Sequence, residues 1–297
     1  MDIIEILKII LIGVVEGLTE WLPISSTGHM ILLDEFIKLQ VSEDFWNMFL
    51  VVIQLGAILA VVILYFAKLN PFSSSKSAYE KKETWTIWGK IFVGVLPAAI
   101  LGLLLNDWME EHLYNPSVVA AALIVYGIAF IVVEVMRERD SSKQTAKGAH
   151  FARSEEALDE DDALLDISYP KALGIGFFQV LSLVPGTSRS GSTILGGLIL
   201  GTSRTTATEF SFFMAIPVMF GASLLKIVKF FVKGNTFSSQ ELFILGLGMF
   251  VALLVSILSI KFLLKFIKTN DFKPFGIYRI ILGVLVIAYF IANGNLL

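Results

Sequence analysis

Six runs of mostly apolar residues constrain this chain most, because each is close to the length that an α-helix needs to cross the ~30 Å hydrocarbon core of a bilayer. They occupy residues 48–66, 86–105, 117–136, 209–228, 241–263 and 276–293. The composition agrees, since 56% of the 297 residues are hydrophobic and 16% are charged, against about 45–50% and about 25% in water-soluble domains. We expect an all-α integral membrane protein with six transmembrane helices.

Other features of the composition exclude several classes of protein. The chain contains no Cys, which excludes disulfide frameworks and thiolate metal sites. The net charge is only −3, and Lys and Arg are spread over the loops, so we expect no nucleic-acid partner. The N-terminal segment carries acidic residues where a signal peptide would be basic, so we expect it to be retained.

Two further apolar segments, 1–38 and 171–203, are interrupted by Pro, Gly, Ser, Thr and charged residues. A Pro-Gly-Thr-Ser sequence breaks a helix and frees backbone groups that hydrocarbon cannot satisfy. Broken helices of this kind occur where the backbone lines a cavity inside a membrane protein. We therefore expect two re-entrant helix–loop–helix elements in addition to the six transmembrane helices.

The distribution of positive charge predicts how the chain crosses the membrane. Lys and Arg are frequent in 67–85 and 137–171, whereas 39–47 and 106–116 contain neither and carry acidic residues instead. Because cytoplasmic loops are enriched in positive charge, we expect the first two loops inside and the other two outside. Alternation then places 229–240 outside, although it contains two lysines, and about 264–275 in the cytoplasm.

A polar segment, 138–168, divides the single membrane domain 1–297 into similar halves, 1–136 and 171–297. Its crowded acidic residues repel one another, which predicts a solvated cytoplasmic loop. The matching segments of the two halves are 13–16 with 176–179 and 22–28 with 184–191. Each half contains one re-entrant element and three crossings, so the second half enters the membrane from the opposite side. This pattern predicts an inverted-topology repeat.

The first interrupted segment carries two acidic residues. Glu16 and Glu20 lie four residues apart, so a helix places both on one face. Carboxylates inside a membrane segment are costly unless they line a wet cavity, meet a cation or pair with Arg. Glu16 and Glu20 would suit Mg²⁺ or Ca²⁺, which prefer oxygen ligands. Alternatively, one of them acts as an acid or a base.

Three hydroxyl residues, Ser25, Ser26 and Thr27, are followed by Gly28 and His29. A hydroxyl nucleophile needs a nearby base, and His is the side chain best suited to that role near neutral pH. A single His beside Ser is more often structural, but the two carboxylates upstream favour a catalytic role.

The second interrupted segment, 185–192, combines hydroxyls and backbone N–H groups with Arg189. Glycine lets the backbone approach a ligand, a helix N-terminus attracts anions, and Arg binds phosphate with two donors. Residues that would line this anion cradle are Gly186, Thr187, Ser188 and Ser190. The alternative is a Gly/Ser-rich break from which Arg189 reaches the surface.

Bringing the two interrupted segments together would join carboxylates, hydroxyls and an imidazole to a guanidinium. Phosphoryl transfer requires in-line attack, charge neutralisation and proton transfer, and these side chains supply all three. Carboxylates alone would suit ion transport, whereas Arg189 beside an anion cradle favours a phosphorylated substrate.

These motifs resemble those of the bacterial undecaprenyl-diphosphate phosphatases, also called bacitracin-resistance proteins. The matching segments are 16–23, 25–29, 52–56 and 185–191. The resemblance implies a catalytic set of Glu16, Glu20, Ser26, His29 and Arg189, with phosphate-binding candidates Ser25, Thr27, Gly186, Thr187, Ser188, Ser190 and Gln54. Gln54 alone would more often be a helix-packing residue, and either Ser26 or His29 could attack phosphorus.

Type-2 phosphatidic-acid phosphatases share Ser-Gly-His and Ser-Arg strings with this chain. Their second motif requires a His where this chain has Leu195, which argues against membership of that superfamily.

The resemblance also implies a function and a location. The expected activity is removal of the terminal phosphate from undecaprenyl diphosphate, which recycles the peptidoglycan lipid carrier and confers bacitracin resistance. The expected location is the bacterial cytoplasmic membrane, with the site opening to the outer face. The expected partners are the bilayer and a polyprenyl diphosphate lipid, with a homodimer as an open alternative to a monomer. A polyprenyl-phosphate flippase is the competing function, because inverted repeats recur in transporters.

Overall fold

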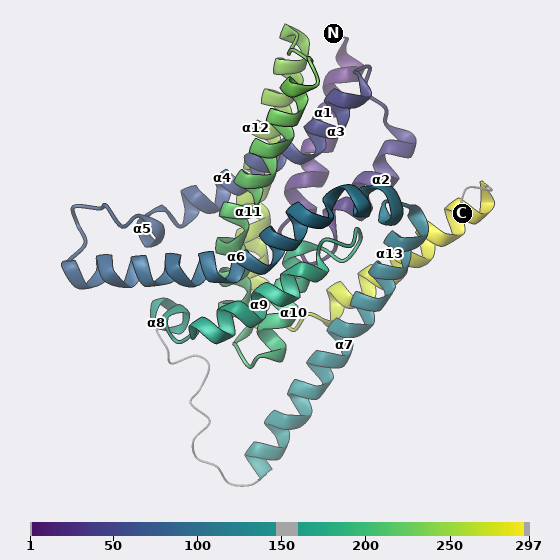
Figure 1. The fold of residues 1–297 in the computed structure, drawn as a ribbon. Coiled ribbons are helices and arrows are strands. Elements are labelled where there is room, and N and C mark those ends of the chain that lie inside the picture. Colours follow the sequence, from purple (N-terminus) through teal and green to yellow (C-terminus); the bar gives the residue numbers. More distant parts are fainter. Residues whose placement is uncertain (1, 147–159, 294–297) are drawn as a thin grey trace.

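The computed structural model describes residues 2–146 and 160–293, and every regular element in these residues is a helix (Figure 1). The elements are α1 (Ile3–Thr19), α2 (Ser26–Phe36), α3 (Glu43–Val52), α4 (Gln54–Leu64), α5 (Phe66–Leu69), α6 (Ala78–Leu113), α7 (Pro116–Ala146), α8 (Glu160–Leu165), α9 (Tyr169–Leu181), α10 (Arg189–Ile199), α11 (Arg204–Val232), α12 (Ser239–Ile267) and α13 (Lys273–Ala292).

Six stretches of the described residues are long and apolar enough to cross a membrane. They are Glu43–Leu64, Ala78–Leu105, Pro116–Asp140, Arg204–Val232, Ser239–Ile267 and Lys273–Ala292. Each of the six predicted apolar runs overlaps one of these stretches. The expectation of a helical chain with six candidate membrane-spanning segments is therefore confirmed for the described residues.

Two boundaries differ from the sequence-based expectation. The first crossing consists of α3 and α4, which are separated at Ile53 although neither Pro nor Gly stands there. Helix α7 continues to Ala146, so the first part of the predicted polar loop 138–168 is helical. Its far end is held against the protein, because Leu164 is buried and Lys90 donates a hydrogen bond to the Leu165 carbonyl at 2.7 Å. Residues 147–159 of this segment lie outside the described residues.

Both interrupted segments are broken where the sequence predicted. Helices α1 and α2 are separated by residues 20–25, and α9 and α10 are separated by residues 182–188. Each pair therefore consists of two short helices joined by a tight loop, which brings a helix N-terminus to the tip of each pair.

Helices of one half of the chain pack mainly on helices of the other half (Figure 1). Helix α1 lies along α12, and α9 lies along α6. The close approach in the second pair requires glycine, because a Cβ added at Gly176 would collide with the Gly94 carbonyl. Likewise α4 packs on α12, α11 packs on α6, and α7 packs on α13. This exchange of partners holds the two loops near one another in the interior.

The largest buried apolar cluster lies directly beside the loops. Trp21, the residue after Glu20, is fully buried and meets the edge of Phe212 at a centroid distance of 5.1 Å. Phe210, Phe213 and Met214 of α11 belong to the same cluster. The first loop is therefore anchored in the core, which fixes the polar residues on either side of Trp21.

Candidate active site

Each of the two loops ends at a serine with left-handed backbone geometry. Ser25 has φ 73° and Ser188 has φ 72°, a conformation that is uncommon for residues other than glycine. The Ser25 hydroxyl accepts a hydrogen bond from the Gly28 N–H at 3.3 Å, and the Ser188 hydroxyl accepts one from the Gly191 N–H at 3.1 Å. Both serines therefore start a helix as N-caps, and strained backbone of this kind clusters at functional sites.

Glu20 accepts three hydrogen bonds, two of which reach the start of α10 in the second helix pair. The Ser26 hydroxyl donates to Glu20 Oε2 at 2.7 Å, and Arg189 Nη2 donates to Glu20 Oε1 at 3.1 Å. The Ser190 hydroxyl donates to the Glu20 backbone carbonyl at 3.0 Å. Glu20 is 6% exposed and Ser26 is 9% exposed. The structure thus brings a hydroxyl, a carboxylate and a guanidinium into one buried chain of contacts.

Arg189 is the first residue of α10 and has partners on two sides. Its Nη1 donates to the Ser211 carbonyl at 2.9 Å, and its guanidinium lies 5.8 Å from the Trp21 ring centre. Its Nε is buried and has no hydrogen-bond partner among the described residues. A guanidinium that is oriented on one side and has an unused donor is ready to bind an oxyanion.

Glu16 lies one helical turn before Glu20 and is 1% exposed. Its Oε1 atom is buried without a hydrogen-bond partner in the described part of the chain. Burying an ionised carboxylate is costly unless a cation or donors compensate it. The orphaned oxygen therefore fits a role in holding a cation, although no cluster of three His, Asp or Glu residues exists within residues 2–146 and 160–293.

The His29 ring is held at both nitrogens. Its Nδ1 donates to the Ser25 carbonyl at 2.7 Å, and its Nε2 lies 2.7 Å from the Tyr278 hydroxyl. The hydroxyl of Ser26 donates to Glu20 instead. The proton path expected from sequence, from Ser26 to His29, therefore differs from the observed hydrogen bonds, in which Glu20 is the partner of Ser26.

Comparisons with known proteins show the family of this chain. The family model described as "Bacitracin resistance protein BacA" matches residues 9–285, which is nearly the whole chain. The chain belongs to this family. A relative from Enterococcus faecalis, named undecaprenyl-diphosphatase, is 56% identical over 96% of this chain and 97% of its own length. Relatives with the same name from Lactiplantibacillus plantarum and Streptococcus thermophilus are 56% and 52% identical, each over 97% of this chain and over 98% and 94% of their own lengths.

The other residues expected from the family motifs take different positions. Thr187 donates its hydroxyl to the Leu181 and Val184 carbonyls, so this hydroxyl serves the loop itself. Ser188 caps α10, and its hydroxyl lies 3.1 Å from that of Ser190. Gly186 has φ 93° and so provides the turn that glycine favours.

Two further candidates lie in first turns of helices. Thr27 is partly buried in the first turn of α2, directly after Ser26. Gln54 is partly buried at the first residue of α4, beside the interruption at Ile53. Their assignment as phosphate-binding residues stays a prediction.

The polar residues of α11 divide between the site and the packing of helices. Glu209 accepts hydrogen bonds from Lys68 at 3.0 Å and from Tyr65 at 3.2 Å, so its carboxylate joins α11 to the end of the first crossing. The Ser211 hydroxyl shares a hydrogen bond with Thr193 at 2.6 Å, while its carbonyl orients Arg189.

Arg279 is a site residue that the sequence analysis missed. It is fully buried, and its Nη1 donates to the Pro23 carbonyl at 3.1 Å. Its Nη2 donates to the carbonyls of Gly186 and Thr187 at 2.8 and 2.9 Å. One guanidinium thus holds both loops of the candidate site. The sequence does carry one signal for this residue, because Arg279 is the single basic residue in the otherwise apolar run 276–293.

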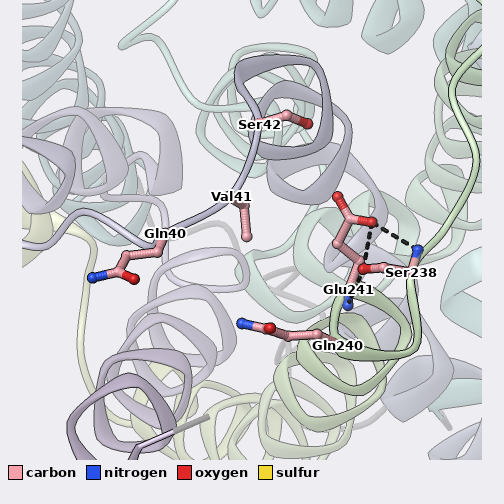
Figure 2. Close-up of a pocket in the computed structure, with 6 residues that line it drawn as sticks. All are labelled: Gln40, Val41, Ser42, Ser238, Gln240 and Glu241. Carbon is pink, nitrogen blue, oxygen red and sulfur yellow. Dashed lines mark hydrogen bonds between the residues drawn. The ribbon is translucent and has the colours of Figure 1, made fainter.

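A surface hollow of about 430 Å³ lies at the starts of α3 and α12 (Figure 2). It is lined by Gln40, Val41, Ser42, Ser238, Gln240 and Glu241, none of which belongs to the candidate site. Figure 2 shows that Glu241 accepts hydrogen bonds from Ser238, which is the capping box of α12. The polar groups there are used to start a helix, so we assign no ligand to this hollow.

Proposed function

We propose that the cluster around Glu20 is where this chain acts as an undecaprenyl-diphosphatase. The reaction removes the terminal phosphate of undecaprenyl diphosphate, recycles the lipid carrier for peptidoglycan synthesis and confers bacitracin resistance. The observation that carries the assignment is the Glu20 carboxylate, which joins the Ser26 hydroxyl to the Arg189 guanidinium across the two loops.

These contacts support a two-step mechanism with Ser26 as nucleophile. Glu20 takes the Ser26 proton while Oγ attacks the terminal phosphorus. The bond to the bridging oxygen breaks, and Glu20 passes the proton to the departing polyprenyl phosphate, which leaves the carboxylate ionised for the second step. Arg189 neutralises the phosphate oxygens as charge develops. Water, deprotonated by Glu20, then hydrolyses the phosphoserine to release inorganic phosphate. His29 is the alternative nucleophile, but both of its nitrogens are already engaged.

A divalent cation is the second part of the proposal. Mg²⁺ binds through one or two carboxylates together with substrate phosphate oxygens and water, and the orphaned Glu16 oxygen fits such a donor set. Glu16 and Glu20 would hold Mg²⁺ or Ca²⁺, and the bound cation would neutralise phosphate charge. We expect a chelator to reduce phosphate release and added Mg²⁺ or Ca²⁺ to restore it.

We also infer that the two helix pairs are re-entrant and that the halves form an inverted repeat in the bacterial cytoplasmic membrane. The matched left-handed serines and the reciprocal packing of α1 on α12 and α9 on α6 support this inference. The predicted outer position of 229–240 is supported by the contact of Lys233 with Asp44, at 2.6 Å, which joins this segment to 39–47. The site would then open to the outer face.

The test is phosphate release from a polyprenyl diphosphate by the purified full chain in detergent. Wild type should release phosphate, while Glu20→Ala and Arg189→Ala should lose roughly 10²-fold or more of the rate. The exposed Arg139→Lys serves as a matched control and should retain full activity. Near-normal rates in both alanine variants would overturn the assignment. Movement of lipid phosphate across vesicles without phosphate release would favour the flippase instead.

A further inference from the structure

The contact between Tyr278 and His29 is used by no step of the mechanism above. The Tyr278 hydroxyl lies 2.7 Å from His29 Nε2, and the two rings are nearly parallel, at 5° and a centroid distance of 5.7 Å. Because a carbonyl only accepts, the contact with Ser25 shows that His29 Nδ1 carries the hydrogen. In the neutral ring Nε2 is therefore an acceptor, and the Tyr278 hydroxyl donates to it.

This pair lies at the exposed edge of the site. Glu20 and Ser26 are 6% and 9% exposed, whereas Tyr278 is 43% exposed. His29 is bound to the carbonyl of Ser25, the residue before Ser26, so the imidazole lies one peptide unit from the proposed nucleophile. The Ser25–Ser26 peptide unit thus links the buried Glu20–Ser26 contact to the His29–Tyr278 contact at the exposed edge.

The substrate of the proposed function has two phosphates that share one oxygen. The terminal phosphate must reach Ser26 and Arg189 inside the protein, while the prenyl chain must stay in hydrocarbon outside it. The other phosphate therefore lies between these two positions. The exposed residues of α13 near Tyr278 are apolar, since Ile277, Ile281 and Leu285 are 52%, 54% and 58% exposed. A lipid chain can lie against such a surface.

Resting on the proposed function, we propose that Tyr278 and His29 form a second phosphate subsite that binds the phosphate remaining on the lipid. The Tyr278 hydroxyl can exchange its acceptor, His29 Nε2, for a phosphate oxygen without moving its ring. His29 stays anchored to Ser25 through Nδ1. The negative charge of a phosphate bound beside Nε2 favours the protonated imidazole, which then donates from Nε2 to the same phosphate. Charge-assisted hydrogen bonds of this kind are the strong ones.

The two reaction products separate the two subsites experimentally. Polyprenyl monophosphate carries only the phosphate of the second subsite, whereas inorganic phosphate occupies the terminal subsite. The experiment measures inhibition of polyprenyl diphosphate hydrolysis by each product, for wild type and Tyr278→Phe. Phenylalanine keeps the ring that stacks on His29 and removes only the hydroxyl. Tyr289→Phe, on the same helix α13, is the matched control.

We expect Tyr278→Phe to raise the inhibition constant of polyprenyl monophosphate roughly tenfold, as for loss of one hydrogen bond to a charged group. The inhibition constant of inorganic phosphate should stay at the wild-type value, and Tyr289→Phe should change neither. An unchanged constant for polyprenyl monophosphate, or an equal change for both products, would overturn the second subsite. Absence of hydrolysis in wild type would instead overturn the proposed function, and direct binding of polyprenyl monophosphate to both proteins would still test the subsite.

Discussion

At the scale of single residues, the site depends on two arginines with different kinds of partner. Each arginine has a buried Nε without a partner among the described residues. Arg189 binds the Glu20 carboxylate and one carbonyl through its Nη atoms. It can therefore exchange contacts when a phosphate arrives. Arg279 binds three backbone carbonyls from the two loops and is fully buried. Its displacement would leave all three acceptors unsatisfied, so we assign it a positioning role.

Replacing Arg279 by Lys tests this positioning role. Lysine keeps the charge but is a single point donor that cannot span Pro23 and the Gly186–Thr187 carbonyls together. We expect phosphate release to fall roughly 10–100-fold and the melting temperature in detergent to fall by several degrees, since each lost buried hydrogen bond costs about 1–3 kcal/mol. Arg139→Lys, at an exposed position, should change neither quantity. Wild-type activity in Arg279→Lys would contradict the role.

Single residues were predictable from sequence where polarity interrupted an apolar segment. Glu20, Ser26 and Arg189 stand in motifs that no lipid-facing helix needs, and the structure brings them together. Arg279 and Tyr278 stand in a run that reads as an ordinary transmembrane helix. Their roles arise from contacts with residues far away along the chain. The contacts with the first helix pair span 249 or more positions, and those with the second loop span about 90. A single sequence does not reveal such contacts.

At the scale of elements, close packing between the halves sets where the loops lie. Helix α9 approaches α6 so closely that the Gly94 carbonyl occupies the space of a Cβ at Gly176. Helix α9 ends at Leu181, just before the loop 182–188 that leads to Arg189. Moving α9 outward would therefore move the second loop away from Glu20.

The variant Gly176→Ala should force this separation. We expect destabilisation of about 1–3 kcal/mol from overpacking, with a matching loss of phosphate release. Gly246→Ala is the control, because a Cβ at this exposed position in α12 meets no atom within 4 Å. Thermal unfolding in detergent should give a lower melting temperature for Gly176→Ala only. Equal melting temperatures for the two variants would show that the close contact is not required.

The elements themselves were predictable where local chemistry dictates them. Pro23 and the Pro185–Gly186 pair mark the two interruptions, and apolar length marks the six crossings. The interruption at Ile53 has no Pro or Gly, so tertiary packing sets it. Helix α7 extends beyond its apolar stretch into polar sequence. Once the apolar part of the helix is formed, the next turns can continue it in water without an apolar face to bury.

At the scale of the whole molecule, the two halves form one protein by exchanging packing partners. Helix α1 packs on α12 of the second half, and α9 of the second half packs on α6. This exchange places both loop tips beside Arg279. The sequence predicts a repeat, and that repeat stays a prediction. It does not predict which helices pack together, because that depends on which surfaces fit. The homodimer stays a prediction.

The proposed topology predicts which loops face each side of the membrane. The chain has no Cys, so each introduced thiol is the only one. We expect Gln40→Cys and Thr236→Cys in intact cells to react with a membrane-impermeant maleimide, because both loops should lie outside. Ser74→Cys and Thr269→Cys should react only after the membrane is permeabilised. Labelling of Thr236→Cys and Ser74→Cys from the same side would contradict the inverted repeat.

The central claim is that Glu20 and Arg189 act as one unit across the two loops. A double-mutant cycle with Glu20→Asp, Arg189→Lys and their combination measures this coupling as rates of phosphate release from polyprenyl diphosphate. We predict that the rate of phosphate release falls roughly 10²-fold in each single variant. The rate of the double variant should lie within about threefold of the rate of the slower single variant. A double variant whose loss equals the product of the two single losses would show that the residues act independently, and would contradict the account.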